Sequence, residues 1–307
     1  MPKTALFANH NPGSVLTIQD VEAHPGNVRF VDASHAAAAN ALGGGQSPDK
    51  PFSTLAYVMT NASTLTPALA AGDVIYVMPG HTETIAAAAG IACATAGVKI
   101  IGLGWGSSRP TFTWTATDAT WTITAASVTI RNILTEVTID EVVKMWDITG
   151  AFAELDRVDF RLNTSAEEAI QFANATAAAT DFHMHHCRHH QATAAAANAQ
   201  WVEFIGARSV IEDNVFDIEL TNNAASKILS NGTAAIGLVV SRNRIFAIGA
   251  SCIPISMHAS SEGIASDNRV VSTGTLAGKI ALGGLSGCEN YAATTANKNG
   301  ILDPVVA

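Results

Sequence analysis

Histidines are concentrated in one short segment, residues 182–190, which holds five of the ten histidines in the chain. In an extended strand, His183 and His185 lie on one face. Two imidazoles at this spacing could bind zinc or nickel, with a third ligand from His189 or from a neighbouring chain. The alternative is a polar outer face. Because spacing alone fixes only two ligands, we predict no metal and no cofactor, and keep His183, His185 and His189 as the candidate ligands.

Three carboxylates, Asp156, Glu212 and Asp213, form a second candidate group. Paired carboxylates act as general acid and base in polysaccharide hydrolysis. The alternative is a solvated face of alternating charges, which helps solubility and strand register. The sequence contains no recognisable catalytic motif, so the prediction leans against an enzyme. If the protein is an enzyme, Asp156, Glu212 and Asp213 are the candidate catalytic residues.

A repeat of about 27 residues brings these positions together. Six segments align on Asn132, Val158, Cys187, Asn214, Asn243 and Asn268, and residues 72–77 and 97–102 look like two earlier turns. Short strands separated by tight turns, with no helices between them, predict a β-solenoid of about eight turns. An Asn that recurs at one position fits a left-handed bend, and stacked Asn amides also fit a hydrogen-bonded ladder.

The alignment predicts two outward columns of side chains. The first contains Ile130, Asp156, His185, Glu212, Ser241 and Ser266, and the second contains Arg131, Arg157, His186, Asp213, Arg242 and Asp267. Asp156 and Glu212 would then lie two turns apart, roughly 9–10 Å between backbones. That separation is close to the one between the two carboxylates of inverting glycosidases.

The N-terminal part carries a family resemblance. Residues 45–55 read Gly-Gln-Ser-Pro-Asp-Lys-Pro-Phe-Ser-Thr-Leu, a helix is predicted over 54–70, and residues 72–81 read Gly-Asp-Val-Ile-Tyr-Val-Met-Pro-Gly-His. This arrangement resembles the start of right-handed parallel β-helix (pectate-lyase-like) proteins, over about residues 29–285. The resemblance implies an all-β, right-handed, single-stranded parallel β-helix whose open end is capped by the helix. The family includes polysaccharide lyases, polysaccharide hydrolases and many phage virion proteins.

The predicted domain organisation follows from this resemblance. Residues 1–28 form an N-terminal arm, 29–71 a first strand, a loop and the capping helix, 72–285 the parallel β-helix, and 286–307 a C-terminal tail. Four aromatic residues, Trp105, Phe112, Trp114 and Trp121, lie close together in the sequence. We expect them to pack in the core or at a contact, and the alternative is a platform on which sugars stack.

Composition and charge exclude several classes of function. The formal net charge of −9 argues against a nucleic-acid-binding protein, and the sequence shows neither a secretory signal nor a membrane span. The alanine- and threonine-rich, lysine-poor sequence looks like the phage members of the family. We therefore predict a phage virion structural protein, most specifically a capsid decoration or cement protein. It would be made in the host cytoplasm and located in the virion.

The expected partners follow from that prediction. We expect a homotrimer that contacts the major capsid protein or other virion proteins and binds no nucleic acid and no membrane. Phe7, Leu16 and Ile18 would anchor the arm to its partner. Two alternatives stay open: a tailspike-like protein that binds or cleaves polysaccharide, and a polysaccharide lyase or hydrolase.

Overall fold

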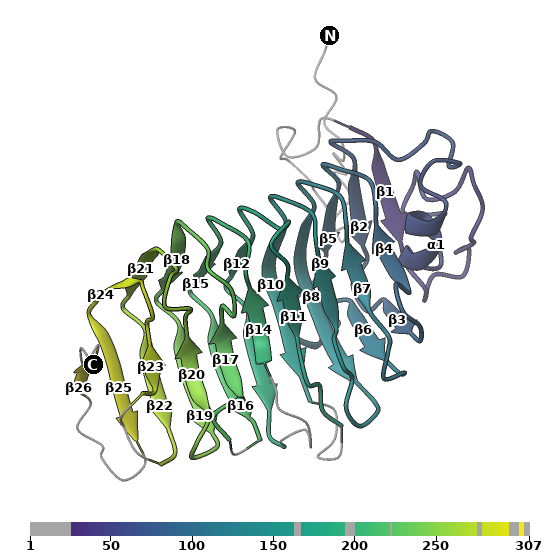
Figure 1. The fold of residues 1–307 in the computed structure, drawn as a ribbon. Helices are drawn as coiled ribbons and strands as arrows, with labels where there is room; N and C mark the ends of the chain where they lie inside the picture. The colour runs from purple at the N-terminus through teal and green to yellow at the C-terminus, as the bar shows by residue number, and fades with distance from the viewer. Residues whose placement is uncertain are drawn as a thin grey trace, which may run out of the picture.

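The chain forms a parallel β-solenoid with one short helix at its N-terminal end (Figure 1). The computed structural model describes residues 26–162, 167–193, 200–221, 223–274 and 278–294, and the backbone of 301–303. The predicted all-β parallel solenoid is confirmed, and its right-handed sense stays a prediction. Phe7, Leu16 and Ile18 lie outside the described residues. No helix in the described ranges is long and apolar enough to cross a membrane.

Three ladders of parallel strands run along the solenoid axis. The first ladder contains β1 (Val28–Val31), β2 (Val74–Val77), β5 (Lys99–Gly102), the first halves of β8 (Thr129–Val137) and β10 (Glu154–Arg161), β12 (His183–His185), β15 (Val210–Glu212), β18 (Leu238–Ser241), β21 (Gly263–Ser266) and β24 (Ser286–Cys288). The second contains β3 (Thr82–Ile85), β6 (Thr111–Trp114), the second halves of β8 and β10, β13 (Arg188–Gln191), β16 (Val215–Glu219), β19 (Arg244–Ile248), β22 (Arg269–Ser272) and β25 (Asn290–Thr294). The third contains β4 (Ile91–Cys93), β7 (Trp121–Ile123), β9 (Trp146–Ile148), β11 (Ala173–Ala175), β14 (Gln200–Phe204), β17 (Lys227–Ser230), β20 (Ile253–Ser256) and β23 (Ile280–Ala281).

The last strand departs from the parallel pattern. The first two ladders continue past residue 285 into β24 and β25, and only then does β26 (Ile301–Asp303) pair antiparallel with β25. Antiparallel pairing occupies the outermost strand edge, which would otherwise present unpaired backbone groups.

The register agrees with the predicted repeat except at one step. Residues 74–77 pair with 99–102, as the offset of 25 predicted. Arg131 pairs with Asp156, however, so Arg131 and not Ile130 belongs to the first outward column. Asn132 is therefore equivalent to Arg157, and the alignment of Asn132 with Val158 was wrong by one residue.

A left-handed residue marks the bend between the first and second ladders. The backbone φ angles are +58° at Asn132, +54° at Arg157, +56° at His186, +56° at Asp213, +55° at Arg242 and +56° at Asp267. The recurring Asn214, Asn243 and Asn268 come one residue later, so the prediction that they adopt the left-handed conformation was wrong. Their side chains turn inward instead and are buried.

The buried asparagines form the ladder that the repeat predicted. The Asn243 Oδ1 accepts hydrogen bonds from the Asn214 backbone N–H (3.2 Å) and side-chain amide (3.1 Å). Its own side-chain amide donates to the Asn268 Oδ1 (3.0 Å) and to the Ile211 carbonyl (2.9 Å). Asn268 repeats this pattern with Asn290. Because buried amides need partners on both ends, the ladder fixes the register of successive turns.

Aromatic side chains fill the middle of the solenoid. Trp121 and Trp146 stack with ring centroids 4.6 Å apart, and Phe112 meets Trp121 edge-on at 4.9 Å. Phe112, Trp114 and Trp121 are fully buried, so the predicted packing is confirmed for these three. Trp105 differs, because 86% of its surface is exposed.

The capping helix is α1 (Leu55–Thr60), which is shorter than predicted and begins after the N-cap Thr54. The Glu83 carboxylate accepts from the backbone N–H groups of Leu55 (2.6 Å) and Ala56 (2.8 Å). His81, which is fully buried, lies 3.1 Å from Glu83 through its Nε2. A carboxylate at the first turn satisfies helix donors that have no partner within the helix. This contact ties α1 to the first turn of the solenoid.

The ladder makes a stability prediction. Replacing Asn243 with Ala removes the acceptor for Asn214 and the donor for Ile211, and leaves both groups buried. We expect the free energy of unfolding to fall by about 3 kcal/mol or more, measured by chemical denaturation. Asn174→Ala is the matched control, because the Asn174 side chain lies on the outer face of the third ladder and donates one 3.4 Å hydrogen bond, to Asp147. Equal losses in the two variants would contradict a special role for the ladder.

Candidate functional site

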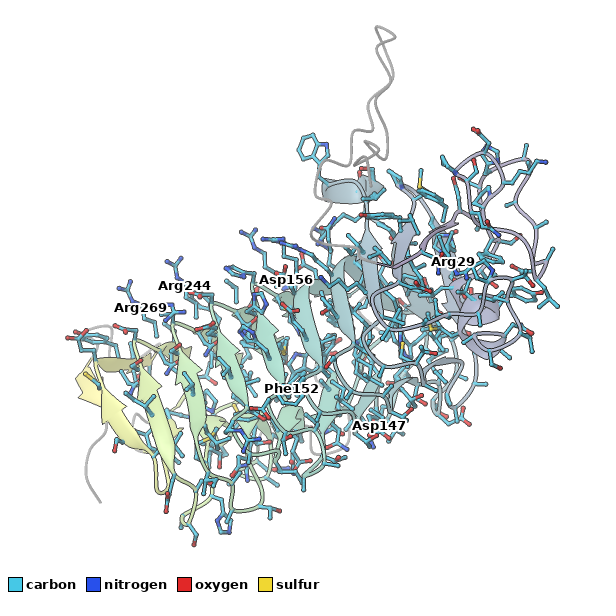
Figure 2. All side chains as sticks on the ribbon, turned by 90° about the horizontal axis from the view of Figure 1, so that it is seen from above. Arg29, Asp147, Phe152, Asp156, Arg244 and Arg269 are labelled. Atoms are coloured by element: carbon cyan, nitrogen blue, oxygen red, sulfur yellow. The ribbon has the colours of Figure 1, made fainter. Side chains whose placement is uncertain are left out.

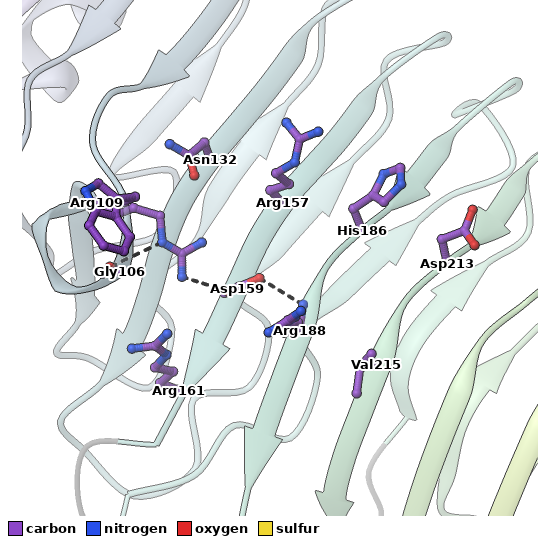
Figure 3. A pocket seen from close by; sticks show the side chains of 11 residues that line it. Gly106, Arg109, Asn132, Arg157, Asp159, Arg161, His186, Arg188, Asp213 and Val215 are labelled. Atoms are coloured by element: carbon purple, nitrogen blue, oxygen red, sulfur yellow. Dashed lines mark hydrogen bonds and ion pairs between the residues drawn. The ribbon is translucent and has the colours of Figure 1, made fainter.

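Two adjoining hollows form a groove on the outer face, where the first and second ladders meet. They have volumes of about 470 and 560 Å³, in the range of ligand sites, and share His186, Asp213 and Val215. Figure 3 shows the arrangement: Arg157, His186 and Asp213 follow one another on successive turns, with Arg161, Arg188 and Val215 beside them. The left-handed residues of the bend thus form one side of the groove.

The groove is rich in arginine although the chain is acidic. Seven of the ten arginines in the sequence line the two hollows: Arg109, Arg157, Arg161, Arg188, Arg242, Arg244 and Arg269. The lining acids are Asp159, Asp213 and Asp267, so the formal charge of the lining is 7 − 3 = +4 with neutral histidine. A concave surface of one sign concentrates ions of the opposite sign. The groove therefore attracts anions.

Some of these arginines are held by acids within the chain. Arg109 donates to the Asp159 Oδ2 at 2.7 Å, and both side chains are buried. The other Asp159 oxygen accepts from the Arg188 backbone N–H at 2.9 Å (Figure 3). Arg242 donates to both Asp213 oxygens, at 2.9 and 2.7 Å, and this pairing lowers the pKa of Asp213. These pairs shape the groove wall.

A second set of arginines has no ion pair among the described residues. Arg188, Arg244 and Arg269 occupy one column, with Val215 between Arg188 and Arg244. All three are exposed, and Figure 2 shows Arg244 and Arg269 projecting from neighbouring turns on one side of the body. Neighbouring strands lie about 4.8 Å apart, so the like charges of Arg244 and Arg269 repel each other. A bound anion would relieve this repulsion.

Trp105 stands at the N-terminal end of the groove. It precedes a short 3₁₀ turn, Gly106–Ser108, and its indole is largely exposed. Exposed indole rings stack on the apolar faces of ligands. The sugar-stacking alternative considered for the four aromatic residues therefore applies to Trp105 alone.

The structure brings the three candidate carboxylates onto the same face: Asp213 lines the groove, and Asp156 and Glu212 lie beside it. Asp156, His185 and Glu212 occupy equivalent positions on successive strands of the first ladder, as the repeat predicted. Asp156 is buried and pairs with Arg131 (2.7 Å) and Arg157 (3.2 Å). Their catalytic role stays a prediction.

Ion pairs also hold the other two carboxylates. Burial by itself raises the pKa of Glu212, but hydrogen bonds from Arg242 and His183 outweigh it, and the pKa lies below its ordinary value. The pKa of Asp213 is lowered by its hydrogen bond from Arg242. A general acid must keep its proton at the working pH, which requires a raised pKa. In this state Glu212 and Asp213 are better suited to hold arginine than to donate protons.

The histidine segment splits at the bend. His183 and His185 face outward on β12, and their rings stack with centroids 4.1 Å apart. His185 Nε2 lies 2.9 Å from the Glu154 Oε1, and this hydrogen bond lowers the pKa of Glu154 to about 2. His183 Nε2 lies 3.1 Å from the Glu212 Oε1. His186 takes the left-handed position and lines the groove.

His189 lies apart from this pair, in the core. Its Nδ1 accepts from the Trp201 indole N–H at 2.8 Å, and its ring meets Phe172 edge-on at 4.1 Å. The bend at His186 reverses which residues face inward, so His189 cannot act as a ligand with His183 and His185. Burial lowers the pKa of His189 to about 3.

The arginine column escaped the sequence prediction. The predicted columns stopped at the residue before each central position, whereas Arg188, Arg244 and Arg269 each follow the central residue. An Arg directly after the central residue in three of six aligned segments was a signal that could have identified the column. Trp105 carried no comparable signal, because a sequence does not show which aromatic residue of a cluster stays outside the core.

Comparison with known proteins supports the fold. No protein-family model matches the sequence, and a search of curated proteins finds no match. A solved structure described as a rhamnogalacturonan lyase is similar to this chain, with a TM-score of 0.51 and 13% sequence identity. The similarity covers 87% of this chain and 74% of that one. At this identity the likeness concerns the fold: the chain is a parallel β-helix protein, in agreement with the pectate-lyase-like resemblance of its sequence.

His189 makes a prediction for acid stability. The unfolded chain binds a proton at this residue below a pH of about 6.5, whereas the folded chain binds it only near pH 3. The unfolded state therefore holds more protons in this window, and stability falls as the pH falls through it, by up to about 1.4 kcal/mol per pH unit from this group.

His189→Gln keeps an acceptor for Trp201 and removes the titration. We expect the unfolding free energy of this variant to depend less steeply on pH between 6.5 and 3 than that of the unmodified chain, in denaturant titrations at several pH values. His258→Gln is the control, because the His258 side chain is partly exposed, and this variant should keep the pH dependence of the unmodified chain. Parallel curves for the His189→Gln variant and the unmodified chain would show that His189 titrates normally.

Proposed function

We propose that this protein binds an acidic polysaccharide, which lies along the arginine groove. The observation that carries the proposal is the column of Arg188, Arg244 and Arg269, which presents three exposed guanidinium groups that form no ion pair with any residue the structure describes. Guanidinium groups recognise carboxylates and sulfates through paired, charge-assisted hydrogen bonds. A polymer with an acidic group on each sugar would meet successive arginines along the axis.

The shape and charge of the protein favour a saccharide over a nucleic acid. The chain carries a net charge of −9, and seven of its ten arginines line the groove. Nucleic-acid binders present broad basic faces that displace counterions. The groove is also open and long, and ends at the exposed Trp105, which suits the apolar face of a sugar ring. The fold likeness to a rhamnogalacturonan lyase is consistent with a polysaccharide ligand.

The proposal agrees with the tailspike-like alternative, and leaves the virion assignment as a prediction. The virion assignment includes the location, the trimer and the contacts with a capsid protein. It rests on the alanine- and threonine-rich, lysine-poor composition and on arm residues outside the described ranges. Binding and cleavage are also separate matters. The carboxylates beside the groove are paired with arginine, so the geometry supports binding more strongly than hydrolysis.

The proposal predicts that groove arginines control affinity. Arg188→Gln and Arg244→Gln should each weaken binding to polygalacturonate roughly tenfold, because each removes a charged hydrogen-bond donor. The affinity of the unmodified protein should fall steeply as salt rises, and neutral dextran should not bind. Isothermal titration calorimetry measures both effects.

Arg208→Gln is the matched control, because Arg208 is exposed but pairs with Asp181 outside the groove. It should bind polygalacturonate, or another acidic polymer such as alginate or a sulfated glycan, as the unmodified protein does. Release of unsaturated uronates or reducing sugars, tested in parallel, reports cleavage. Absence of binding to every acidic polymer, or equal effects of Arg188→Gln and Arg208→Gln, would refute the proposal.

A further inference from the structure

A cluster of nitrogen and oxygen ligands lies on the first ladder, beside the groove. One side-chain atom each of Glu154, His183 and His185 lies within 4.8 Å of the other two. We propose that Glu154, His183 and His185, with Glu212 as fourth ligand, bind one divalent transition-metal ion of the zinc type. The proposal does not depend on the polysaccharide, because none of these four residues lines the groove.

Three neighbouring strands place the four side chains. Glu154 on β10 pairs with His183 on β12, and His185 on β12 pairs with Glu212 on β15. All four project outward, because the residues between them, Leu155 and Met184 among them, face the core. The strand register thus places one carboxylate on each side of the two stacked imidazoles.

The distances suit a small ion. His185 Nε2 and the Glu154 Oε1 are 2.9 Å apart, and His183 Nε2 and the Glu212 Oε1 are 3.1 Å apart. Zinc lies about 2.1 Å from nitrogen and oxygen ligands, so the ligand atoms of a tetrahedral site are about 3.4 Å apart. Small rotations of Glu154, His183 and His185 would therefore admit the ion. Glu212 lies outside their 4.8 Å group and contacts His183 only, so its side chain would have to turn further toward the ion. Two carboxylates and two neutral imidazoles also balance a double positive charge.

An unpartnered oxygen gives independent support. The Asp156 Oδ1 is buried and has no hydrogen-bond partner among the described residues, and the His185 Nδ1 lies 2.7 Å from the His186 Nδ1 and 3.5 Å from this oxygen. A metal on the Nε2 of His185 would require its Nδ1 to carry the proton. A small rotation of the ring would turn that N–H from His186 to Asp156, which gives the carboxylate–histidine–metal arrangement common around zinc. Metal binding would thus give the buried oxygen a partner.

Further contacts hold the carboxylates in place. The Thr129 hydroxyl donates to the Glu154 Oε2 at 2.9 Å, and Arg242 donates to the Glu212 Oε2. In each case the outer oxygen is occupied and Oε1 stays directed at an imidazole. The imidazole content favours zinc, nickel or copper over calcium, which prefers sites built wholly from oxygen.

The test uses Zn²⁺ alone and the full chain, first treated with a chelator and dialysed. Competition with a chromophoric chelator should show one Zn²⁺ per chain. His183→Asn and His185→Asn should each weaken that site by more than about 100-fold. His190→Asn is the matched control, because His190 lies on the second ladder, is exposed and pairs with Asp217 of the next turn. This variant should bind zinc normally.

Further measurements exclude a folding artefact and report the geometry of the site. Circular dichroism and thermal unfolding of the metal-free variants establish that they are folded. Glu154→Gln has nearly the same shape as the unmodified chain and should also weaken zinc binding. It serves as the test if a histidine variant fails to fold. Co²⁺ bound in place of zinc should show the strong visible absorption of a tetrahedral nitrogen- and oxygen-ligated ion, and lose it in His185→Asn.

Three results would overturn the proposal. The first is the absence of a zinc site in the unmodified chain. The second is a site that persists unchanged in folded His183→Asn, His185→Asn and Glu154→Gln. The third is Ca²⁺ competing with Zn²⁺ at equal concentration, which would indicate a site made of oxygen ligands elsewhere.

Discussion

The bend between the first two strand ladders is the constraint on which the rest of the structure depends. From Asn132 onward, one residue at each of these bends adopts the left-handed conformation and the next turns its side chain inward. From Asn214 onward that inward residue is Asn, whose amide links one turn to the next. A left-handed conformation is costly for side chains such as Arg157 and His186, and the buried hydrogen bonds and the packed core offset the cost. The repeated bend keeps every turn in the same register.

The chemistry of the surface follows from this bend. The left-handed residue points outward while its neighbour points inward. The bend therefore produces a row of polar side chains, which forms one side of the groove. Strands on either side then place their outward residues in columns, in which successive members lie about 4.8 Å apart. One column holds Arg188, Arg244 and Arg269, which form no ion pair within the described part of the chain. The first ladder holds the Glu and His cluster. The same repeat that builds the core therefore concentrates cations in one line and metal ligands in another.

More of the fold than of the site could be predicted from the sequence. The spacing of Asn214, Asn243 and Asn268 within a repeat of short strands and tight turns predicted the solenoid, because repeats are visible in a sequence. The alignment failed by one residue at Asn132, because it assumed that the recurring Asn occupies the bend itself. That assumption also hid the reversal of facing at His186, and so grouped the buried His189 with the outward His183 and His185. Contacts between turns, such as Glu154 with His185, depend on side-chain directions that spacing alone does not define.

The structure of the protein in complex with an acidic oligosaccharide tests the central claim most directly. We expect a crystal structure to show the ligand running along the solenoid axis, with its acidic groups on Arg188, Arg244 and Arg269 and a sugar ring near Trp105. Turns of the solenoid should not move, since the groove is built by the bend. An oligosaccharide bound on another face, or a complex in which these arginines make no contact with it, would contradict the account.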